Sequence, residues 1–458
     1  MVKTRSKPGD ADPKGTVDDA AHADAVAALR EANLTFAAAH AGEGPGRQPV
    51  HTVYGGAQLF AADSVPKLGR LALAAMDRFA PDAAAIGTAL GITEHPALAR
   101  IVERVRSKLE REPIEDFRID FEDGYGNRPH AEEDGHARQV VAELTAGAKA
   151  GTLSPFIGMR VKPLNEELRA RSVRTLELVT TGLVDAAALP ERWVVTIPKI
   201  TIIEQVEYTV ALLRRLERQL GLADRTLLFE AMVETPQIVL DTSGRALLPR
   251  LLAASDGRLR GAHFGTYDYT AGINITAAHQ RMRHPACDFA KHFMQVAFAS
   301  TEVWLSDGST TVMPVPVHRA GEGQALTAMQ EAENTASVHA AWRLHFDDVR
   351  YSLAGGFYQG WDLHPAQLVS RYGALYSFFL EGIESAGGRL SNFVRKAAQA
   401  TLVGDVFDDA ATGQGLLHFF LRGINSGAIT EAEALSMTGL TAADFRGRSF
   451  VRIMKART

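Results

Sequence analysis

The sequence contains very little cysteine, because Cys287 is the single thiol among 458 residues. One cysteine excludes an intramolecular disulfide and a zinc site built on several thiolates. A chain without disulfides is typical of a reducing compartment, so we expect a cytoplasmic location.

Long apolar runs are also missing. No stretch approaches the roughly 18 uncharged apolar residues that a membrane-spanning helix needs, so no membrane partner is expected. Residues 1–15 have no apolar core of the kind found in secretory signals. Residues 1–20 are polar and contain Pro, Gly and Asp, which predicts a disordered lead-in.

Positive charge is not in excess. The 49 Lys and Arg residues face 54 Asp and Glu residues, for a formal net charge of −5. Because nucleic-acid binding requires a basic surface, nucleic acid is not expected as a partner. With 46% hydrophobic and 22% charged residues, the composition is that of a globular protein. It excludes collagen, a coiled coil and a fully disordered chain.

Eight short apolar segments alternate with helical patterns along the chain. The expected strands are His51–Gly55, Phe117–Phe121, Gly158–Val161, Trp193–Pro198, Leu227–Val233, Gly261–Gly265, Thr310–Val317 and Gly356–Leu363. Eight strands that are each followed by helix predict an α/β fold of the (β/α)8 TIM-barrel type. The main competing architecture is a doubly wound open sheet, whose usual G-x-G-x-x-G motif after the first strand is absent.

Two segments exceed the basic barrel. Residues 56–116, after the first strand, contain helical patterns at Val65–Phe79 and His95–Glu110, which predict a helical insertion. The chain after the eighth strand is also rich in helical patterns. We therefore expect a lead-in at residues 1–20, a catalytic barrel at 21–370 that includes the insertion, and a C-terminal helical region at 371–458.

Charged residues recur at the carboxyl ends of the predicted strands. In strand order they are Asp120, Glu122 and Asp123; Arg160 and Lys162; Lys199; Glu230 and Glu234; Asp268; His318; and Asp362 and His364. A charged side chain in an apolar strand is unfavourable unless it is paired or binds a metal. Because the active sites of TIM barrels lie at this end, the series predicts an active site, although any one residue alone could be an ordinary salt-bridge partner.

Glu234 and Asp268 end neighbouring strands of the predicted barrel. Two carboxylates, without thiolates or an H-E-x-x-H pair, favour Mg2+ or Mn2+ over zinc. Mg2+ leaves positions open for water and for the carboxylate and keto oxygens of a 2-oxo acid, and Arg160 could add a second positive charge beside an enolate. The competing interpretation is a ring of salt bridges in which Lys199 or Arg160 pairs with the two carboxylates.

An ordered series of motifs resembles the citrate lyase beta-subunit-like branch of the HpcH/HpaI aldolase family, in the phosphoenolpyruvate/pyruvate barrel superfamily. The series spans residues 50–370 and reads IDFEDGYG, GMRVKPL, TIPKITIIEQVE, MVETPQIVLD, FGTYDYTAGI and GFYQGWDLHPAQL. The family patterns are a strand ending L-E-D, R-V-N-P, P-K-[VI], I-E-T-P, G-x-x-D and G-[FY]-x-G-x-x-x-H-P. Malyl-CoA lyases and malate synthases are more distant relatives.

The resemblance implies roles for residues of the matching motifs. Glu234 and Asp268 would be the ligands of Mg2+, with Mn2+ as a substitute. Arg160 would contact the oxyanion of the substrate. Glu122 and Asp123 would hold metal-bound water or assist proton transfer.

Further implications of the resemblance concern the substrate and its surroundings. The backbone around Gly265 and Thr266 would receive the substrate carboxylate, since glycine permits close approach. Lys162 and Tyr267 depart from the family, which usually has Asn and frequently Glu at these positions. In the malate synthase relatives a C-terminal segment supplies an acidic residue. Asp405, Asp408 and Asp409 are candidates for it here, with a solvated loop as the simpler interpretation.

The sequence thus predicts a Mg2+-dependent carbon–carbon lyase or aldolase that acts on a 2-oxo or 3-hydroxy acid or its acyl-CoA thioester. The resemblance also implies a homo-oligomer. One alternative is a condensing enzyme similar to malate synthase or malyl-CoA lyase. A second is a metal-independent aldolase that forms a Schiff base on Lys199. A third is a barrel that binds ligands without catalysis.

Overall fold

The computed structural model describes residues 22–42, 44, 46–321, 323–395, 401–403, 406–408 and 410–455. The predicted lead-in at residues 1–20 lies outside them, as do Asp405, Asp409 and the side chain of Asp408. The chain divides into two compact units, residues 1–44 with Ala299–Glu302, and Pro45–Phe298 with Val303–Thr458. The first unit contains α1 (Ala23–Ala39), which buries none of its side chains.

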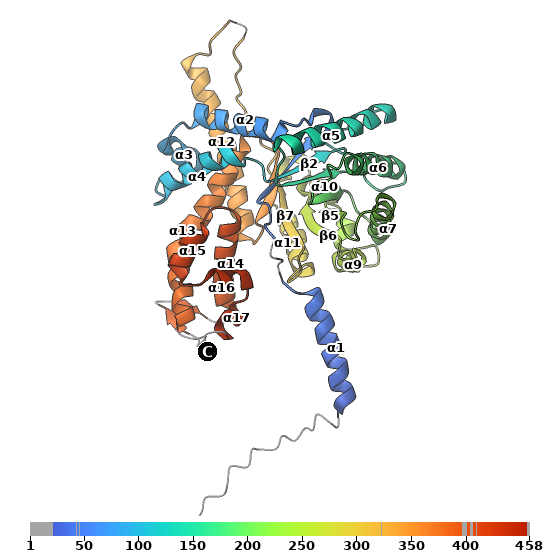
Figure 1. Cartoon of the computed structure of the whole chain (residues 1–458). Helices are drawn as coiled ribbons and strands as arrows, with labels where there is room; N and C mark the ends of the chain where they lie inside the picture. Colours follow the sequence, from blue (N-terminus) through green and yellow to red (C-terminus); the bar gives the residue numbers. More distant parts are fainter. Residues whose placement is uncertain are drawn as a thin grey trace, which may run out of the picture. The chain divides into compact units, whose positions relative to one another are not determined.

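The second unit is built on a closed barrel of eight parallel strands in chain order (Figure 1). The strands are β1 (His51–Gly56), β2 (Asp116–Asp120), β3 (Phe156–Arg160), β4 (Trp193–Ile197), β5 (Leu228–Val233), β6 (Leu259–Phe264), β7 (Trp304–Ser309) and β8 (Gln359–Asp362). β8 returns to pair with β1, where Thr52 lies opposite Trp361. The predicted (β/α)8 barrel is confirmed.

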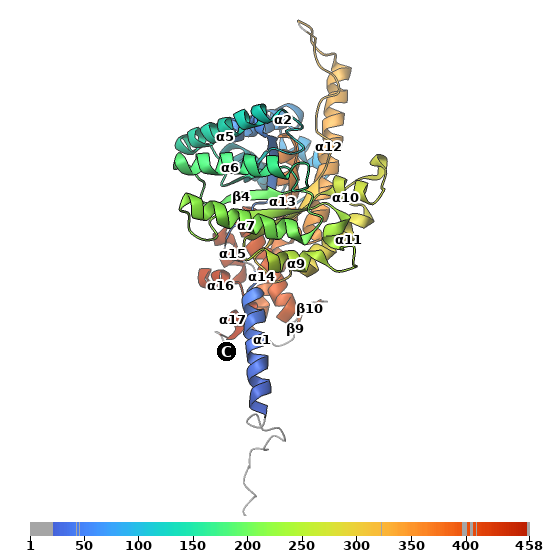
Figure 2. The same ribbon diagram turned by 90° about the vertical axis from the view of Figure 1, so that its right-hand side faces the viewer.

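Helices surround the barrel between successive strands. They are α5 (His130–Ala150), α6 (Arg169–Asp185), α7 (Ile203–Leu220), α8 (Pro236–Val239), α9 (Leu247–Ala254), α10 (Thr266–Gly272), α11 (Pro285–Ala297) and α12 (Ala328–Ala354). Figure 2 shows α5, α6 and α7 side by side along one side of the barrel. Their apolar residues recur at helical spacing, as in α7, where Val206, Val210, Leu213 and Leu216 are all buried.

The insertion after β1 is helical, as predicted. It consists of α2 (Ser64–Phe79), α3 (Ala83–Leu90) and α4 (Leu98–Arg111), preceded by a short 3-10 turn at Ala57–Leu59. Two of these helices match the predicted patterns, and α3 is additional. α3 is rich in alanine and ends at Gly91, whose positive φ of 66° closes the helix.

The C-terminal part is helical, as predicted. It contains α13 (Gln367–Arg395), a hairpin of β9 (Thr401–Val403) and β10 (Val406–Asp408), α14 (Ala410–Asn425), α15 (Glu431–Thr438), α16 (Ala442–Gly447) and α17 (Phe450–Lys455). α13 packs against α4, α12, α14 and α15. In Figure 1 the C-terminal helices, orange to red, lie together on one side of the barrel. The predicted domain boundaries remain predictions.

The predicted seventh strand is wrong. The strand that completes the barrel is Trp304–Ser309, and the apolar run Thr310–Val317 follows it as coil. Pro314 and Pro316 in this run have no backbone N–H to donate to a neighbouring strand. Val317 is 62% exposed, so the run supplies no buried strand face. His318 therefore does not lie at a strand end, and its ring contacts Glu333 of α12.

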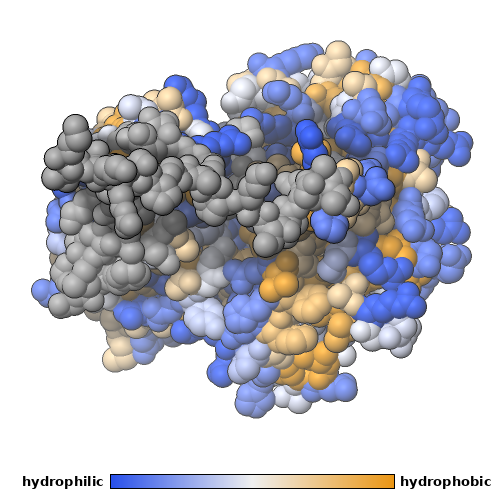
Figure 3. Space-filling model, turned by 90° about the horizontal axis from the view of Figure 1, so that it is seen from below, coloured by the Kyte–Doolittle hydropathy of each residue, from blue (hydrophilic) through white to orange (hydrophobic). Residues whose placement is uncertain are grey.

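In the view from below (Figure 3), a group of hydrophobic residues, orange, stands among hydrophilic ones near the lower edge of the picture. Among the described residues, no helix is both long enough and apolar enough to cross a membrane.

A buried ion cluster fills the middle of the barrel. Arg118 of β2 donates to Glu230 of β5 over 2.8 and 3.1 Å and also contacts Asp116. Because β2 and β5 are not neighbours, the Arg118–Glu230 pair crosses the barrel interior. Burial opposes ionisation, but the charge of Arg118 lowers the pKa of Glu230, so the pair stays ionised. The sequence left Glu230 open between a functional residue and an ordinary salt-bridge partner, and in the structure it is a salt-bridge partner of Arg118.

We expect Arg118→Met to lower the free energy of unfolding by about 3–5 kcal/mol, because it leaves two carboxylates buried without their cation. Urea denaturation measures the change. Arg78→Met is the matched control, since the Arg78–Glu331 pair is half-exposed and is worth less than about 1 kcal/mol. Equal effects of the two variants would contradict this account of the barrel interior.

Candidate active site

Arg160 lies at the carboxyl end of β3 and is held by Asp120 of β2. Its Nε and Nη2 donate to the two oxygens of Asp120 over 2.7 and 2.6 Å, and both side chains are buried. Its Nη1 lies 3.2 Å from Glu122 Oε2. Burial opposes the charge, but Asp120 and Glu122 raise the pKa of Arg160, so the guanidinium remains protonated. Asp120 therefore orients the residue predicted to face the oxyanion.

Sequence reasoning missed Tyr54, which lies beside Arg160, and Trp361, which packs against Tyr54. The guanidinium carbon is 4.8 Å from the centre of the Tyr54 ring, and the Tyr54 and Trp361 rings are 4.6 Å apart. Both residues lie on strands of the barrel, β1 and β8. The alternation of side chains along β1 could have indicated the position of Tyr54. Thr52 and Tyr54 are two residues apart and therefore point to the same face of the strand.

The loop after β2 carries Glu122 and Asp123. Asp120 shapes this loop because its carboxylate accepts the backbone N–H of Glu122 over 2.9 Å and that of Gly124 over 2.7 Å. Lys162 supports the loop from β3 by donating to the carbonyl oxygen of Phe121 over 2.6 Å. The lysine that replaces the usual family asparagine thus has a structural role.

Glu234 follows β5 and is 2% exposed. Its Oε1 accepts the backbone N–H of Lys199 over 2.8 Å. Gly265 lies against the same side chain from β6. A Cβ atom at residue 265 would come within 2.5 Å of Glu234 Cβ and 2.6 Å of Oε2, so glycine alone leaves room for this carboxylate. The absence of a side chain at Gly265 thus lets Glu234 approach its backbone closely, and the predicted contact of this backbone with a substrate carboxylate stays a prediction.

Thr266, next in the chain, begins α10 and is buried. Its Oγ1 has no hydrogen-bond partner within the part of the chain that the structure describes. A buried hydroxyl without a partner is unfavourable unless another group satisfies it. Thr266 therefore suits its predicted contact with a substrate.

The ammonium group of Lys199 joins the remaining acidic residues. It contacts Glu122 directly and lies 3.2 Å from Asp123 Oδ2 and 3.7 Å from Asp268 Oδ2. Asp268, in the first turn of α10, is 42% exposed. The structure thus brings all four predicted acidic site residues to one place, through contacts with either the ammonium or the backbone of Lys199.

Negative charge exceeds positive charge in this cluster. Five carboxylates (Asp120, Glu122, Asp123, Glu234 and Asp268) face two cations (Arg160 and Lys199). Burial, together with the charge of Asp268, raises the pKa of Glu234 to about 7. Burial also raises the pKa of Glu122. Although burial opposes it, the hydrogen bond with Glu122 and the charge of Arg160 lower the pKa of Asp123.

The cluster fits one further cation. The excess of carboxylates over cations suits a further cation, and Glu234 and Asp268 are the two carboxylates that the motif resemblance assigns as its ligands. In the described ranges no group of three or more His, Cys, Asp or Glu side chains is arranged to hold a metal ion. Two protein carboxylates agree with Mg2+, which keeps several waters, and not with the closed ligand sets of structural zinc.

Lys199 is poorly suited to form a Schiff base. Although burial opposes the charge, Glu234 and Glu122 raise the pKa of its ammonium above the ordinary lysine value. A nucleophilic lysine must be neutral. The same contacts agree with the interpretation of Lys199 as a salt-bridge partner of these carboxylates.

Two other strand-end residues lie outside the cluster. Asp362 is buried and accepts from Arg371 over 2.8 Å and from His51 over 2.6 Å. His364 accepts the backbone N–H of Ala366 over 3.2 Å through Nδ1, which is a structural contact. Burial lowers the pKa of His364, so its ring is neutral at physiological pH.

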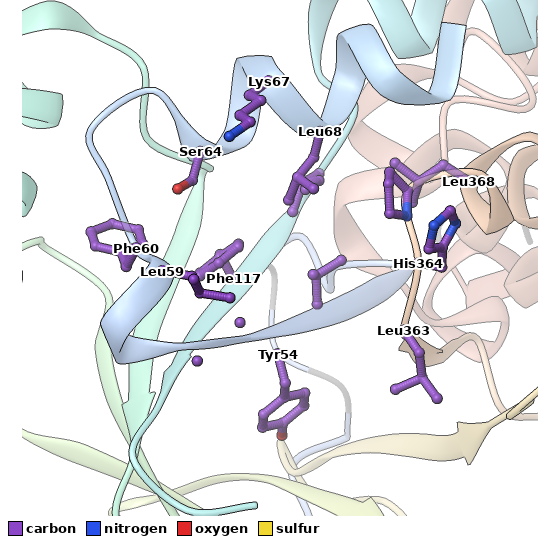
Figure 4. Close-up of a pocket in the computed structure, with 15 residues that line it drawn as sticks. Tyr54, Leu59, Phe60, Ser64, Lys67, Leu68, Phe117, Leu363, His364 and Leu368 are labelled. Atoms are coloured by element: carbon purple, nitrogen blue, oxygen red, sulfur yellow. The ribbon is translucent and has the colours of Figure 1, made fainter. Parts of the chain in front are cut away.

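A cavity of about 310 Å3 lies between the carboxyl end of β1, α2 and the segment after β8 (Figure 4). Its walls are mainly apolar, with Ser64, Lys67 and His364 as the polar side chains. In Figure 4 the Tyr54 ring points away from Ser64 and Lys67. The cavity adjoins the acidic loop, because Gly56 lines it and a Cβ there would be 2.4 Å from the carbonyl oxygen of Gly124.

These features define an α/β barrel with an ionised, partly buried cluster of side chains at the carboxyl ends of its strands. The chain belongs to the family described as a domain of unknown function, DUF6986, whose model matches residues 29–453. A comparison with curated proteins finds no match.

Solved structures similar to this chain include a citrate lyase from Burkholderia xenovorans LB400, with 19% sequence identity and a TM-score of 0.52 over 74% of this chain and 92% of that chain. A malate synthase of Haloferax volcanii in a magnesium/glyoxylate complex is 14% identical, with a TM-score of 0.43 over 88% and 97%. RipC from Yersinia pestis is 15% identical, with a TM-score of 0.36 over 58% and 90%. The likeness to the citrate lyase shows a shared barrel fold.

The pKa of Glu234 predicts how stability depends on pH without divalent ions. The folded protein binds this proton more tightly than the unfolded chain does, because the pKa is about 7 in the fold against 4.5 ordinarily. Stability should therefore fall as pH rises between these values. Glu234→Gln has no carboxyl group to titrate at this position. Between about pH 5 and pH 8 we therefore expect the free energy of unfolding of wild type to fall by roughly 2–3 kcal/mol relative to that of Glu234→Gln.

Urea denaturation in EDTA at the two pH values measures this shift. Glu204→Gln, at an exposed position, is the matched control and should follow wild type at both. If the free energies of unfolding of wild type and Glu234→Gln differ by the same amount at both pH values, the pKa of Glu234 is not raised by burial.

Proposed function

We propose that the protein is a Mg2+-dependent carbon–carbon lyase or aldolase that acts on a 2-oxo or 3-hydroxy acid through an enolate. The observation that carries the proposal is the position of Arg160, which Asp120 fixes beside a carboxylate cluster that has too little positive charge. Glu234 and Asp268 would hold the ion, and Mn2+ would substitute. The motif resemblance supports the same assignment and a homo-oligomer, and the low cysteine content supports a cytoplasmic location.

When bound, the ion supplies a Lewis acid for the carboxylate and keto oxygens of the substrate. Arg160 faces the oxygen on which negative charge develops when the carbon–carbon bond breaks. Its orientation is set in advance by Asp120, so little reorganisation accompanies the reaction. The backbone at Gly265 and the hydroxyl of Thr266, which has no hydrogen-bond partner among the described residues, would receive the substrate carboxylate.

Glu122 and Asp123 are the proposed proton-transfer pair. Their pKa values move in opposite directions, with that of Glu122 raised and that of Asp123 lowered. Such a pair can hold one proton between two neighbouring carboxyl groups, as acid–base catalysis requires. Lys199 contacts both carboxylates and keeps them together.

The cavity beside β1 supports an acyl thioester as the form of the substrate. Its volume and apolar walls suit a flexible thioester arm, and Lys67 offers a positive charge at the rim. Because the cavity adjoins the loop that carries Glu122, a thioester bound there would have its acyl end close to the cluster.

Hydrogen exchange at the methyl group of pyruvate tests the enolate chemistry. In D2O with Mg2+, wild type should catalyse exchange that NMR detects, and EDTA should abolish it. Arg160→Met should slow exchange by about 10²–10³-fold while retaining Mn2+ binding. Glu234→Gln and Asp268→Asn should lose both, because each removes an ion ligand.

Glu204→Gln again serves as the control and should exchange at the wild-type rate. Exchange that survives EDTA, with a borohydride-trapped adduct on Lys199, would establish the Schiff-base alternative instead. Absence of exchange and of any stabilisation by Mg2+ with oxalate or pyruvate would favour a binding barrel without catalysis.

Acetyl-CoA tests the thioester form. We expect acetyl-CoA with Mg2+ to raise the melting temperature of wild type, and Lys67→Glu to weaken binding about five- to tenfold, as for a partly exposed charge pair. Calorimetry measures the affinity. Lys149→Glu, an equal charge reversal at an exposed position of α5, should leave it unchanged. If Lys67→Glu and Lys149→Glu bind acetyl-CoA with equal affinity, Lys67 does not contact the bound thioester.

A further inference from the structure

Lys199 occupies an unusual place for a lysine at the end of a barrel strand. It follows β4, and its ammonium lies among Glu122, Asp123 and Asp268, which reach it from the loop after β2 and from α10. Glu122 and Asp123 follow β2, and Asp268 follows β6. In the strand order these two strands lie on either side of β4, which Lys199 follows. A single cation thus joins carboxylates that would otherwise repel one another.

The backbone of Lys199 is also constrained. Its φ is +50°, in the left-handed region that residues with a side chain rarely adopt. In this conformation its N–H donates to Glu234 Oε1 over 2.8 Å. Strained backbone of this kind persists where the surrounding structure requires it, and it clusters at functional sites. The backbone therefore orients one proposed ion ligand while the side chain neutralises its neighbours.

Resting on the proposed function, we propose that Lys199 is a built-in counter-ion that occupies the carboxylate cluster when no divalent ion is bound and competes with that ion for it. Asp268, one proposed ligand, already lies 3.7 Å from the ammonium, and Glu234, the other, is bonded to the lysine backbone. An ammonium and a divalent ion so close to the same carboxylates repel each other.

The side chain of Lys199 is 30% exposed, so the protein does not enclose it completely. Ion binding then requires the ammonium to give up its contacts with Glu122 and Asp123. Without a divalent ion, Lys199 partly neutralises the carboxylates. The same ammonium lowers the affinity of the cluster for the ion. Lys199 acts on the ion through shared carboxylates and is a positioning residue.

Titration with Mn2+, followed by the loss of the electron paramagnetic resonance signal of free Mn2+, tests the proposal without an activity assay. Lys199→Met removes the ammonium and keeps the backbone N–H that binds Glu234. We expect it to bind Mn2+ at least about tenfold more tightly than wild type. Without Mn2+, Lys199→Met should melt at a lower temperature than wild type, and Mn2+ should restore more of its stability.

Lys199→Gln is a second neutral variant, with a polar side chain, and it covers the case in which Lys199→Met folds poorly. It should show the same increase in Mn2+ affinity. Lys149→Met, which removes an exposed lysine from α5, controls for net charge and should bind Mn2+ as wild type does. Glu234→Gln should bind Mn2+ weakly, which assigns the measured ion to this cluster.

The outcomes separate the inference from the function on which it rests. Unchanged affinity in both neutral Lys199 variants, with wild type binding Mn2+ through Glu234, would overturn the competition and leave the proposed metal site intact. Weaker binding in both would also overturn it, because the ammonium would then help to organise the site. If wild type and both variants bind no Mn2+, the inference and the proposed metal dependence fail together.

Discussion

The ion pair between Arg160 and Asp120 is the interaction on which the rest of the site depends. Asp120 binds the guanidinium through both oxygens and uses the same oxygens to accept two backbone N–H groups of the loop that follows it. One buried carboxylate therefore positions a cation and the acidic loop beside it. A buried ion pair is stabilised when hydrogen bonds satisfy its remaining polar atoms, and the two backbone N–H groups do this for Asp120.

The surplus of carboxylates around this pair has consequences for both stability and function. Glu234 is buried with too little positive charge nearby, so its proton is held up to about pH 7. Lys199 relieves part of the repulsion from a strained backbone position. A cluster that is unfavourable on its own is typical of a site prepared for a further charged group.

The sequence predicted much of this arrangement because parallel strands bring their carboxyl ends to one edge. Glu122, Asp123, Arg160, Glu234 and Asp268 were all identified from that rule and the motifs, and the structure brings them together. The seventh strand could not be placed correctly, since the apolar run after residue 309 looks more like a strand than the polar segment before it. Only closure of the barrel selects Trp304–Ser309.

By itself the sequence determined the barrel class, the helical insertion and the residue types at the strand ends, because these follow from local periodicity and chain order. Tertiary structure alone decided how those charges are used. It sent Glu230 into an internal pair with Arg118, placed Tyr54 against Arg160, and put the Lys199 ammonium among the carboxylates. Contacts between distant strands depend on barrel closure and on which partner satisfies each buried charge, and no local pattern in the chain encodes them.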